Sequence, residues 1–241
     1  MSNKIIFHSN KSYNKLEESS NPEPTSKVVP KWYSEADLYV KDPRNGKYIP
    51  NYDGGKTPTF KACPAMLDLF TTGYVLKTPC DLEFYKKDNK LKVRVPEEYK
   101  DFCDERPPMP GFVYPKGYSK NHFHWWPNWA PELPEGYSAL YVNPLNNFGL
   151  PFITVAGIID NDKFNTPGLM PFFLQEDFEG IIEKGTPYVQ IIPFKRDDWE
   201  MSLQIHTQKE LIERHMKSAD TFRKIDGGIY KKFFWTRRKY K

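Results

Sequence analysis

The sequence predicts a mainly β protein, folded as a distorted β-barrel or a jelly-roll-like sandwich. Between Pro134 and Glu200, apolar runs of strand length alternate with turns rich in Gly, Pro and Asn. Twenty-two Pro against 14 Gly favour stiff loops and extended segments over helices, because Pro fixes φ and lacks a backbone donor. Closure or layering would leave few exposed edges among so many short strands. The apolar runs are GYSALYVNP, LPFITVAGIID, EGIIEKG and YVQIIPFKR.

The length of 241 residues suits one large β domain with appendages. We expect residues 1–59 to form an extended N-terminal arm with loops, which includes an edge strand at Lys4–His8. Residues 60–200 should form the β domain. Residues 201–241 should form a C-terminal helix followed by a basic aromatic tail.

Local patterns predict individual elements. Lys90–Val95 alternates charged and apolar residues and should pair with Asp81–Tyr85 as a hairpin. Phe123–Trp126 should be an aromatic strand. Thr207 and Glu210 have the spacing of a capping box at the start of an amphipathic helix. Four apolar strand residues are expected in the core: Ile158, Ile182, Val189 and Ile191.

Composition bounds the function classes. The net charge of +4 comes from the last twelve residues, which hold six Lys and Arg and no acid, so the remainder has a net charge near −2. The body is therefore not a basic nucleic-acid surface. No stretch approaches the ~20 apolar residues of a membrane span, and the first residues lack a signal-peptide core. With three cysteines and no CxxC pair, we expect reduced thiols and a cytoplasmic protein.

Two histidines form the first candidate site. His122 and His124 are alternate residues of an expected strand, so both imidazoles should lie on one face, where they could hold two positions of a divalent metal. Glu132 and Glu135 follow, but no later strand supplies a third histidine. We expect strand histidines without a metal or other cofactor; the alternative is a metal-dependent jelly-roll enzyme.

Acidic residues form the second candidate site. Asp160 and Asp162 follow the apolar run of AGIIDNDKF and could bind a divalent ion or activate water. Asn, Asp and Lys at this position are equally typical of a hairpin turn, which we favour. The acidic run at Glu176, Asp177 and Glu179 is expected to be a solvated turn.

The basic aromatic tail is the third candidate site. We expect it to dock on a protein partner or to take part in self-assembly, and we do not expect nucleic acid or a membrane as its partner. Its partner-binding residues should be Lys231, Lys232, Trp235, Arg237 and Arg238. The chain contains no Gly-rich phosphate loop, no G-x-S-x-G and no HExxH.

Most of the chain resembles a family of uncharacterised proteins of tailed bacteriophages, cyanophages among them, and of some bacteria. The phrases that carry this resemblance include FKACPAMLDLFTTGYVLKTPCDLEF, PEGYSALYVNPLNNFGLPF and FEGIIEKGTPYVQIIPFKRDDW. The resemblance implies a phage or bacterial origin and carries no established activity.

A second resemblance, over about forty residues, is to the dUTPase and dCTP deaminase barrel family. Residues 157–162, GIIDND, are similar to its Gly-(Val/Leu)-Ile-Asp-x-Asp motif, and residues 185–192, GTPYVQII, keep the Gly-to-Gln interval of a later motif. The resemblance implies that Asp160 lies where that family has its water-activating Asp. Phe164 sits one place late, and the family's Arg-Ser-Ser element has no counterpart.

Three function classes follow. The first is a phage-type, non-enzymatic protein that binds a protein partner or forms part of an assembly. The second is a metal-dependent jelly-roll enzyme using His122 and His124. The third is a dUTPase-like, nucleotide-processing barrel using Asp160.

Overall fold

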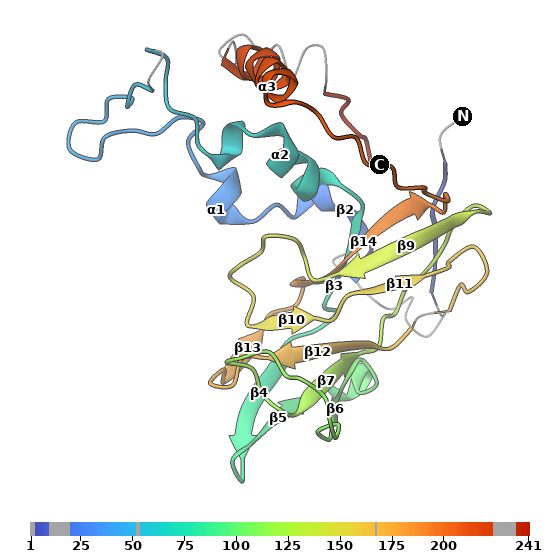
Figure 1. The fold of residues 1–241 in the computed structure, drawn as a ribbon. Helices are drawn as coiled ribbons and strands as arrows, with labels where there is room; N and C mark the ends of the chain where they lie inside the picture. Colours follow the sequence, from blue (N-terminus) through green and yellow to red (C-terminus); the bar gives the residue numbers. More distant parts are fainter. Residues whose placement is uncertain (1–2, 10–19, 52–53, 167, 224–234) are drawn as a thin grey trace. The chain divides into compact units, whose positions relative to one another are not determined.

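The computed structural model describes residues 3–9, 20–51, 54–166, 168–223 and 235–241, with side chains described up to residue 216 of the C-terminal helix. The chain forms two compact units, drawn in Figure 1. The first, which we call the β unit, comprises Met1–Val28, Thr72–Arg196 and Tyr240–Lys241. The second, which we call the helical unit, comprises Val29–Thr71 and Asp197–Lys239.

Fourteen strands of the described residues form the β unit, which confirms the mainly β prediction. Two short 3-10 helices, η3 (Thr25–Lys27) and η5 (Glu97–Tyr99), lie between them. The strands are β1 (Ile6–His8), β2 (Glu23–Pro24), β3 (Tyr74–Lys77), β4 (Leu82–Lys87), β5 (Lys90–Arg94), β6 (Cys103–Arg106), β7 (His122–Trp125), β8 (Ala130–Glu132), β9 (Tyr137–Val142), β10 (Phe152–Thr154), β11 (Gly157–Ile159), β12 (Met170–Leu174), β13 (Gly180–Ile182) and β14 (Pro187–Lys195).

The strands pair in four antiparallel sheets. A five-stranded sheet has the order β11-β9-β14-β3-β2, and a four-stranded sheet has the order β10-β12-β7-β6. The other two sheets are β13-β4-β5 and the pair β1-β8. The sheets are arranged as in a sandwich and do not close into a barrel, so the sandwich form of the prediction is the correct one.

The core lies between the five-stranded and four-stranded sheets. On β7, Trp125 is fully buried and stacks on Phe172 of β12, with ring centroids 3.7 Å apart. Its indole Nε1 donates to Thr154 Oγ1 at 3.0 Å, and that hydroxyl donates to the Tyr188 carbonyl of β14 at 2.6 Å. An aromatic side chain and one hydroxyl thus join the two sheets. The third sheet enters the same core through Phe84, whose ring lies 5.3 Å from that of Phe123.

The β4–β5 hairpin forms as predicted. Asp88 and Asn89 occupy its turn with φ of 50° and 57°. Two consecutive positive φ values are the geometry of a two-residue hairpin loop, and Asn and Asp tolerate it better than most residues.

One run of the sequence divides between two sheets. LPFITVAGIID supplies β10 to the four-stranded sheet and β11 to the five-stranded sheet. Because β11 is an edge strand, Ile158 is 64% exposed, and the prediction that it is buried is wrong. The other three predicted core residues are buried: Ile182, Val189 and Ile191.

The helical unit contains α1 (Lys31–Ser34), η4 (Phe60–Ala62), α2 (Pro64–Thr71) and α3 (Gln208–Arg223). Its aromatic centre is Phe70, whose ring lies 4.3 Å from that of Tyr33 and 5.6 Å from that of Trp32. Residues 60–71, which we assigned to the β domain, fall in this unit because they are helical and pack on α1. No helix of the described residues is long and apolar enough to cross a membrane.

The predicted capping box begins α3. The Glu210 carboxylate accepts from the Thr207 backbone N–H at 2.8 Å, and the Thr207 hydroxyl faces the Glu210 N–H at 3.4 Å. The sequence pattern therefore located this helix start correctly.

We expect Ile191→Ala to lower the free energy of unfolding by about 2–5 kcal/mol, because it removes a fully buried side chain from the central strand. Urea denaturation measures the change. Ile158→Ala is the matched control and should change stability by less than about 0.5 kcal/mol. Equal effects of the two substitutions would contradict the assigned register.

Candidate functional site

The two histidines lie on one face of the four-stranded sheet, as predicted. Their ring centroids are 5.1 Å apart. On the neighbouring strand β6, Asp104 is directly opposite His124, and Arg106 is directly opposite His122. The intervening Phe123 points to the core, so the four polar side chains form a cross-strand quartet on the other face.

The quartet is only partly paired internally. Arg106 Nη2 lies 3.0 Å from Asp104 Oδ2, and His124 Nδ1 lies 3.9 Å from Asp104 Oδ1. Four buried atoms make no hydrogen bond to the described residues: Asp104 Oδ1, Arg106 Nε, His122 Nδ1 and His124 Nδ1. Burial lowers the pKa of both imidazoles, and the Arg106 charge lowers it further, while Asp104 opposes the shift. Both imidazoles are therefore neutral near pH 7.

Neutral imidazoles are in the correct state to bind a metal, and Asp104 is a carboxylate that sequence reasoning missed. The Glu132 side chain considered for this role instead lies 2.8 Å from His8 Nε2. Within the described ranges, no three or more His, Cys, Asp or Glu side chains are grouped so that they could hold a metal ion. Arg106 also places a positive charge beside Asp104. The sequence signal for the missed pair is the i, i+2 spacing of Asp104 and Arg106, which places both side chains on one face of a strand.

We expect His122 and His124 to titrate below about 6.5, the value of an unperturbed histidine. As the pH falls through about 6.5, the unfolded chain binds protons first, so stability declines until the folded pKa is reached and then levels off. NMR titration of the imidazole resonances measures both midpoints. Arg106→Gln should raise both; midpoints at or above about 6.5 in the wild-type protein would contradict the described environment.

The second site, around Asp160 and Asp162, is a dense hydrogen-bonded cluster. The side chain of Asp162 is 2% exposed and forms a two-pronged ion pair with Arg196, one contact of which is 2.8 Å. It also accepts from the Gly136 N–H at 2.9 Å. Asp160 accepts from Ser138 Oγ at 2.6 Å and lies 3.3 Å from Arg196 Nη1.

This arrangement holds a turn in place. The Asp160 carbonyl accepts from the N–H groups of Lys163 and Phe164 at 2.9 and 2.8 Å. Hydrogen bonds from Arg196 are the largest cause that keeps the pKa of Asp162 well below its usual range. Asp162 is therefore a permanent acceptor and is unsuited to act as a general base near pH 7. The half-exposed Asp160 keeps an accessible carboxylate.

Asp162→Asn should lower the urea midpoint at neutral pH, because it removes the negative partner of Arg196. The folded pKa of Asp162 is depressed, so its contribution is complete above the unfolded value of about 3.9 and is lost as the pH falls through the folded pKa. The difference between wild type and variant should therefore narrow in acid. Asp160→Asn is the control, and it should lower the urea midpoint less because the Asp160 carboxylate is half exposed. A larger decrease than with Asp162→Asn would mean that Asp160 is the carboxylate that holds the turn.

The third predicted site is described in part. Lys231 and Lys232 lie outside the described residues. Trp235 Nε1 donates to Asp68 Oδ2 of α2 at 2.9 Å, and Arg238 Nη1 lies 3.9 Å from the same oxygen. Arg237 is exposed. The tail residues Trp235 and Arg238 are thus tied to α2 within the helical unit.

The last two residues of the tail belong to the β unit. The Tyr240 ring lies 5.8 Å from that of Tyr74 on β3, and the Tyr74 hydroxyl donates to the Lys241 carbonyl at 3.3 Å.

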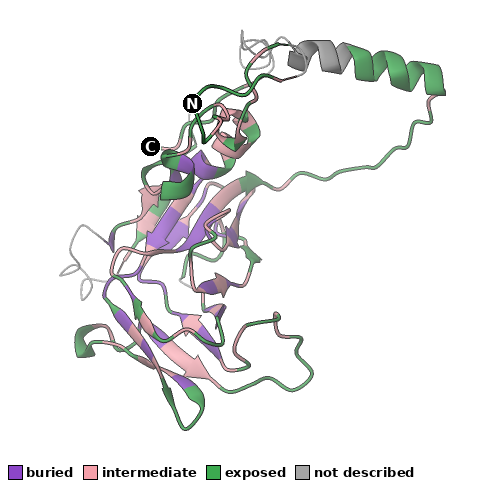
Figure 2. Ribbon diagram, turned by 90° about the vertical axis from the view of Figure 1, so that its left-hand side faces the viewer, coloured by how far each residue is buried: buried purple, intermediate pink, exposed green. Residues whose placement is uncertain are grey.

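A further feature, which the sequence reasoning missed, lies between β14 and α3. We call residues 198–206 the alternating segment. Its odd-numbered residues are apolar and its even-numbered residues are polar. The four apolar side chains are among the most exposed of the described residues: Trp199 (91%), Met201 (82%), Leu203 (82%) and Ile205 (99%). Figure 2 shows the segment as an extended, exposed stretch that leads into α3.

The alternating segment has the pattern of a strand but forms none. None of the described residues pairs with it in a strand or bridge. The helix that follows is also apolar on its surface, with Leu211, Ile212 and Met216 about half exposed. The period-2 pattern of WEMSLQI is the sequence signal for this feature, and the predicted end of the β domain at residue 200 falls inside it.

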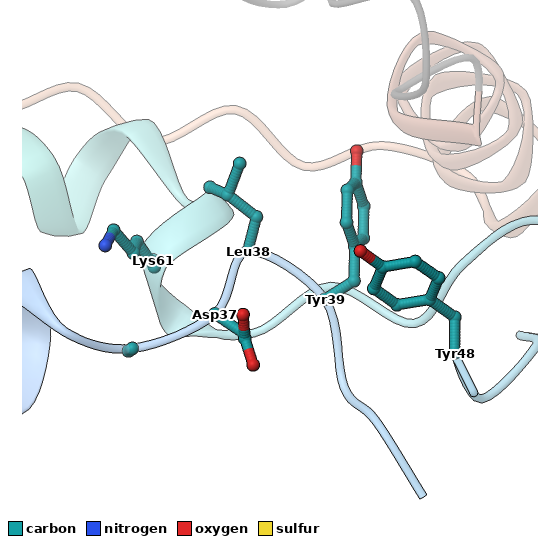
Figure 3. Close-up of a pocket in the computed structure, with 6 residues that line it drawn as sticks. Asp37, Leu38, Tyr39, Tyr48 and Lys61 are labelled. Carbon is teal, nitrogen blue, oxygen red and sulfur yellow. The ribbon is translucent and has the colours of Figure 1, made fainter. Parts of the chain in front are cut away.

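A pocket of about 390 Å³ lies in the helical unit (Figure 3). It is open and its charges are paired: Asp37 binds Lys41 at 3.0 Å, and Lys61 donates to the Ser34 carbonyl. Beside it, Lys56 Nζ lies 4.2 Å from the Tyr48 ring centroid. The lining contains no acid–base pair suited to catalysis. It comprises Ala36, Asp37, Leu38, Tyr39, Tyr48 and Lys61.

Comparison with protein-family models finds no match to this chain, and comparison with curated proteins finds no relative. The two resemblances described from the sequence therefore remain hypotheses.

Proposed function

We propose that the protein is a phage-type, non-enzymatic component of a protein assembly, and that it attaches to its protein partner through the alternating segment and α3. We place this assembly in the host cytoplasm or in the virion. The single observation that carries the proposal is the almost complete exposure of Trp199, Met201, Leu203 and Ile205 in one extended segment.

Exposed apolar residues are common singly, but a contiguous apolar row is typical of an interaction surface. Covering one side chain of this size contributes about 1.5–3 kcal/mol. The row is also of the right geometry for strand addition, in which the backbone of an extended segment pairs with a sheet edge. Alternate side chains then face an apolar surface. The polar side chains of the segment would remain in water.

The basic tail adds a second, electrostatic contribution. Arg237 and its neighbours Arg238 and Lys239 are exposed, and Lys231 and Lys232 add charge in the sequence. Such charges act mainly on the rate of association with acidic surface regions, and salt screens their effect. The free thiols Cys63, Cys80 and Cys103 support a reducing compartment.

Two enzymatic functions remain as alternatives. The first is a metal-dependent enzyme using His122 and His124, whose imidazoles share one face of the sheet, and metal analysis of the purified protein tests it. The second is a nucleotide-processing enzyme using Asp160, whose side chain is half exposed, and a thermal-shift panel of nucleotides tests it. Because the Asp162 carboxylate is already engaged by Arg196 and Gly136, the nucleotide-processing alternative is the weaker of the two.

Replacing the four apolar residues of the alternating segment by Ser should abolish partner association without unfolding the body, because these side chains contact little within the protein. Affinity purification from the producing cells, with quantitative mass spectrometry, compares the variant with wild type. We expect at least one protein that co-purifies stoichiometrically with wild type and is depleted more than tenfold with the variant.

The matched control replaces Asp198, Glu200 and Gln204 by Ser on the polar side of the same segment. It should retain the partner. Thermal unfolding should be unchanged in both variants. Unchanged partner recovery with the apolar-side variant would remove the basis of the proposal.

A further inference from the structure

We infer that the alternating segment pairs with the same segment of a second copy of this chain, as an antiparallel two-stranded ribbon centred on Ser202. This inference rests on the proposed function and names the partner as the protein itself. Its basis is that the segment is complementary to itself in one register, in apolar contacts and in charge.

In the register centred on Ser202, the numbers of two facing residues add up to 404. Trp199 then faces Ile205, and Met201 faces Leu203, so the four apolar side chains pair only with one another. Directly opposite side chains are the pairs that stabilise a sheet. One face of the ribbon is therefore entirely apolar.

The opposite face is polar in the same register. Asp198 faces His206, Glu200 faces Gln204, and Ser202 faces its own copy. No two carboxylates are opposed, and each end of the ribbon places an acid opposite an imidazole. His206 is partly exposed and lies 3.9 Å from Glu210 of its own chain, so it can face a further carboxylate across the ribbon.

Neighbouring registers are worse. A shift by two residues toward the N-terminus places Asp197 opposite Ile205. A shift by two toward the C-terminus leaves Trp199 opposite Thr207, which caps α3 and ends the extended stretch. A shift by one residue puts every apolar side chain opposite a polar one. The apolar pattern of the segment and the start of α3 together select one register.

A two-stranded ribbon alone is marginally stable and needs a second layer on its apolar face. The helix that begins at Gln208 of each chain supplies an amphipathic surface of the right kind. Its exposed apolar residues are Leu211, Ile212 and Met216. The proposed dimer therefore contains two paired strands and two copies of α3. The symmetric pairing uses the same surface on both chains and closes as a dimer.

Cysteine cross-linking tests the register. In a Cys63→Ser background, which removes the one exposed native thiol, Ser202→Cys should form an intermolecular disulfide on mild oxidation. Directly opposed Cα atoms in antiparallel strands lie about 4.5–5.5 Å apart, within disulfide range. Glu200→Cys and Gln204→Cys should each cross-link weakly alone and strongly when mixed. Self-cross-linking of Glu200→Cys in place of Ser202→Cys would overturn the register.

Sedimentation over a range of protein concentrations tests the dimer. Wild type should be a dimer and Leu203→Asp a folded monomer, because the new carboxylate enters the apolar face. Gln204→Lys, which faces Glu200, should tighten the dimer several-fold. A monomeric wild type would overturn the inference. The proposed function would still hold if the variant with Ser at the four apolar positions lost a different protein partner.

Discussion

The fold depends on the link that Trp125 makes between two sheets. Its ring stacks on β12 in one layer, and its Nε1 reaches the backbone of β14 in the other layer through the Thr154 hydroxyl. A buried indole N–H usually has a hydrogen-bond partner, and Thr154 of β10 is the partner of Trp125. The same contact links β7, which carries the histidines, to β14 of the five-stranded sheet.

The two polar clusters of the β unit differ in how completely their hydrogen-bonding capacity is used. Asp162 is fully engaged by Arg196 and the backbone of Gly136, as expected of a structural ion pair that fixes a turn. The quartet around His122 leaves four buried polar atoms without a hydrogen-bond partner among the described residues. Buried polar groups without a hydrogen-bond partner are costly, so this face contributes less to stability than the Asp162 cluster. The contrast separates a group that holds the fold together from one that is open to further chemistry.

Local patterns in the sequence predicted the elements that depend on local physics. The β4–β5 turn, the capping box at Thr207 and the shared face of His122 and His124 all follow from spacings of one to four residues. The burial of Ile158 was mispredicted because an edge strand and a central strand have the same apolar pattern, and only pairing distinguishes them. Asp104 was missed for a similar reason: strand register brings it to His124, and register is a tertiary property.

The alternating segment also has a consequence for how the protein is kept from misassembly. A short segment with high β-propensity and exposed apolar side chains is the usual starting point of uncontrolled aggregation. Acidic residues flank and interrupt this run at Asp197, Asp198 and Glu200. Charges in such positions act as gatekeepers, since stacking many copies in register would bring like charges together. The antiparallel ribbon of two copies keeps these acids apart, whereas an in-register fibril would align them. The same three carboxylates therefore permit dimerisation and oppose fibril formation.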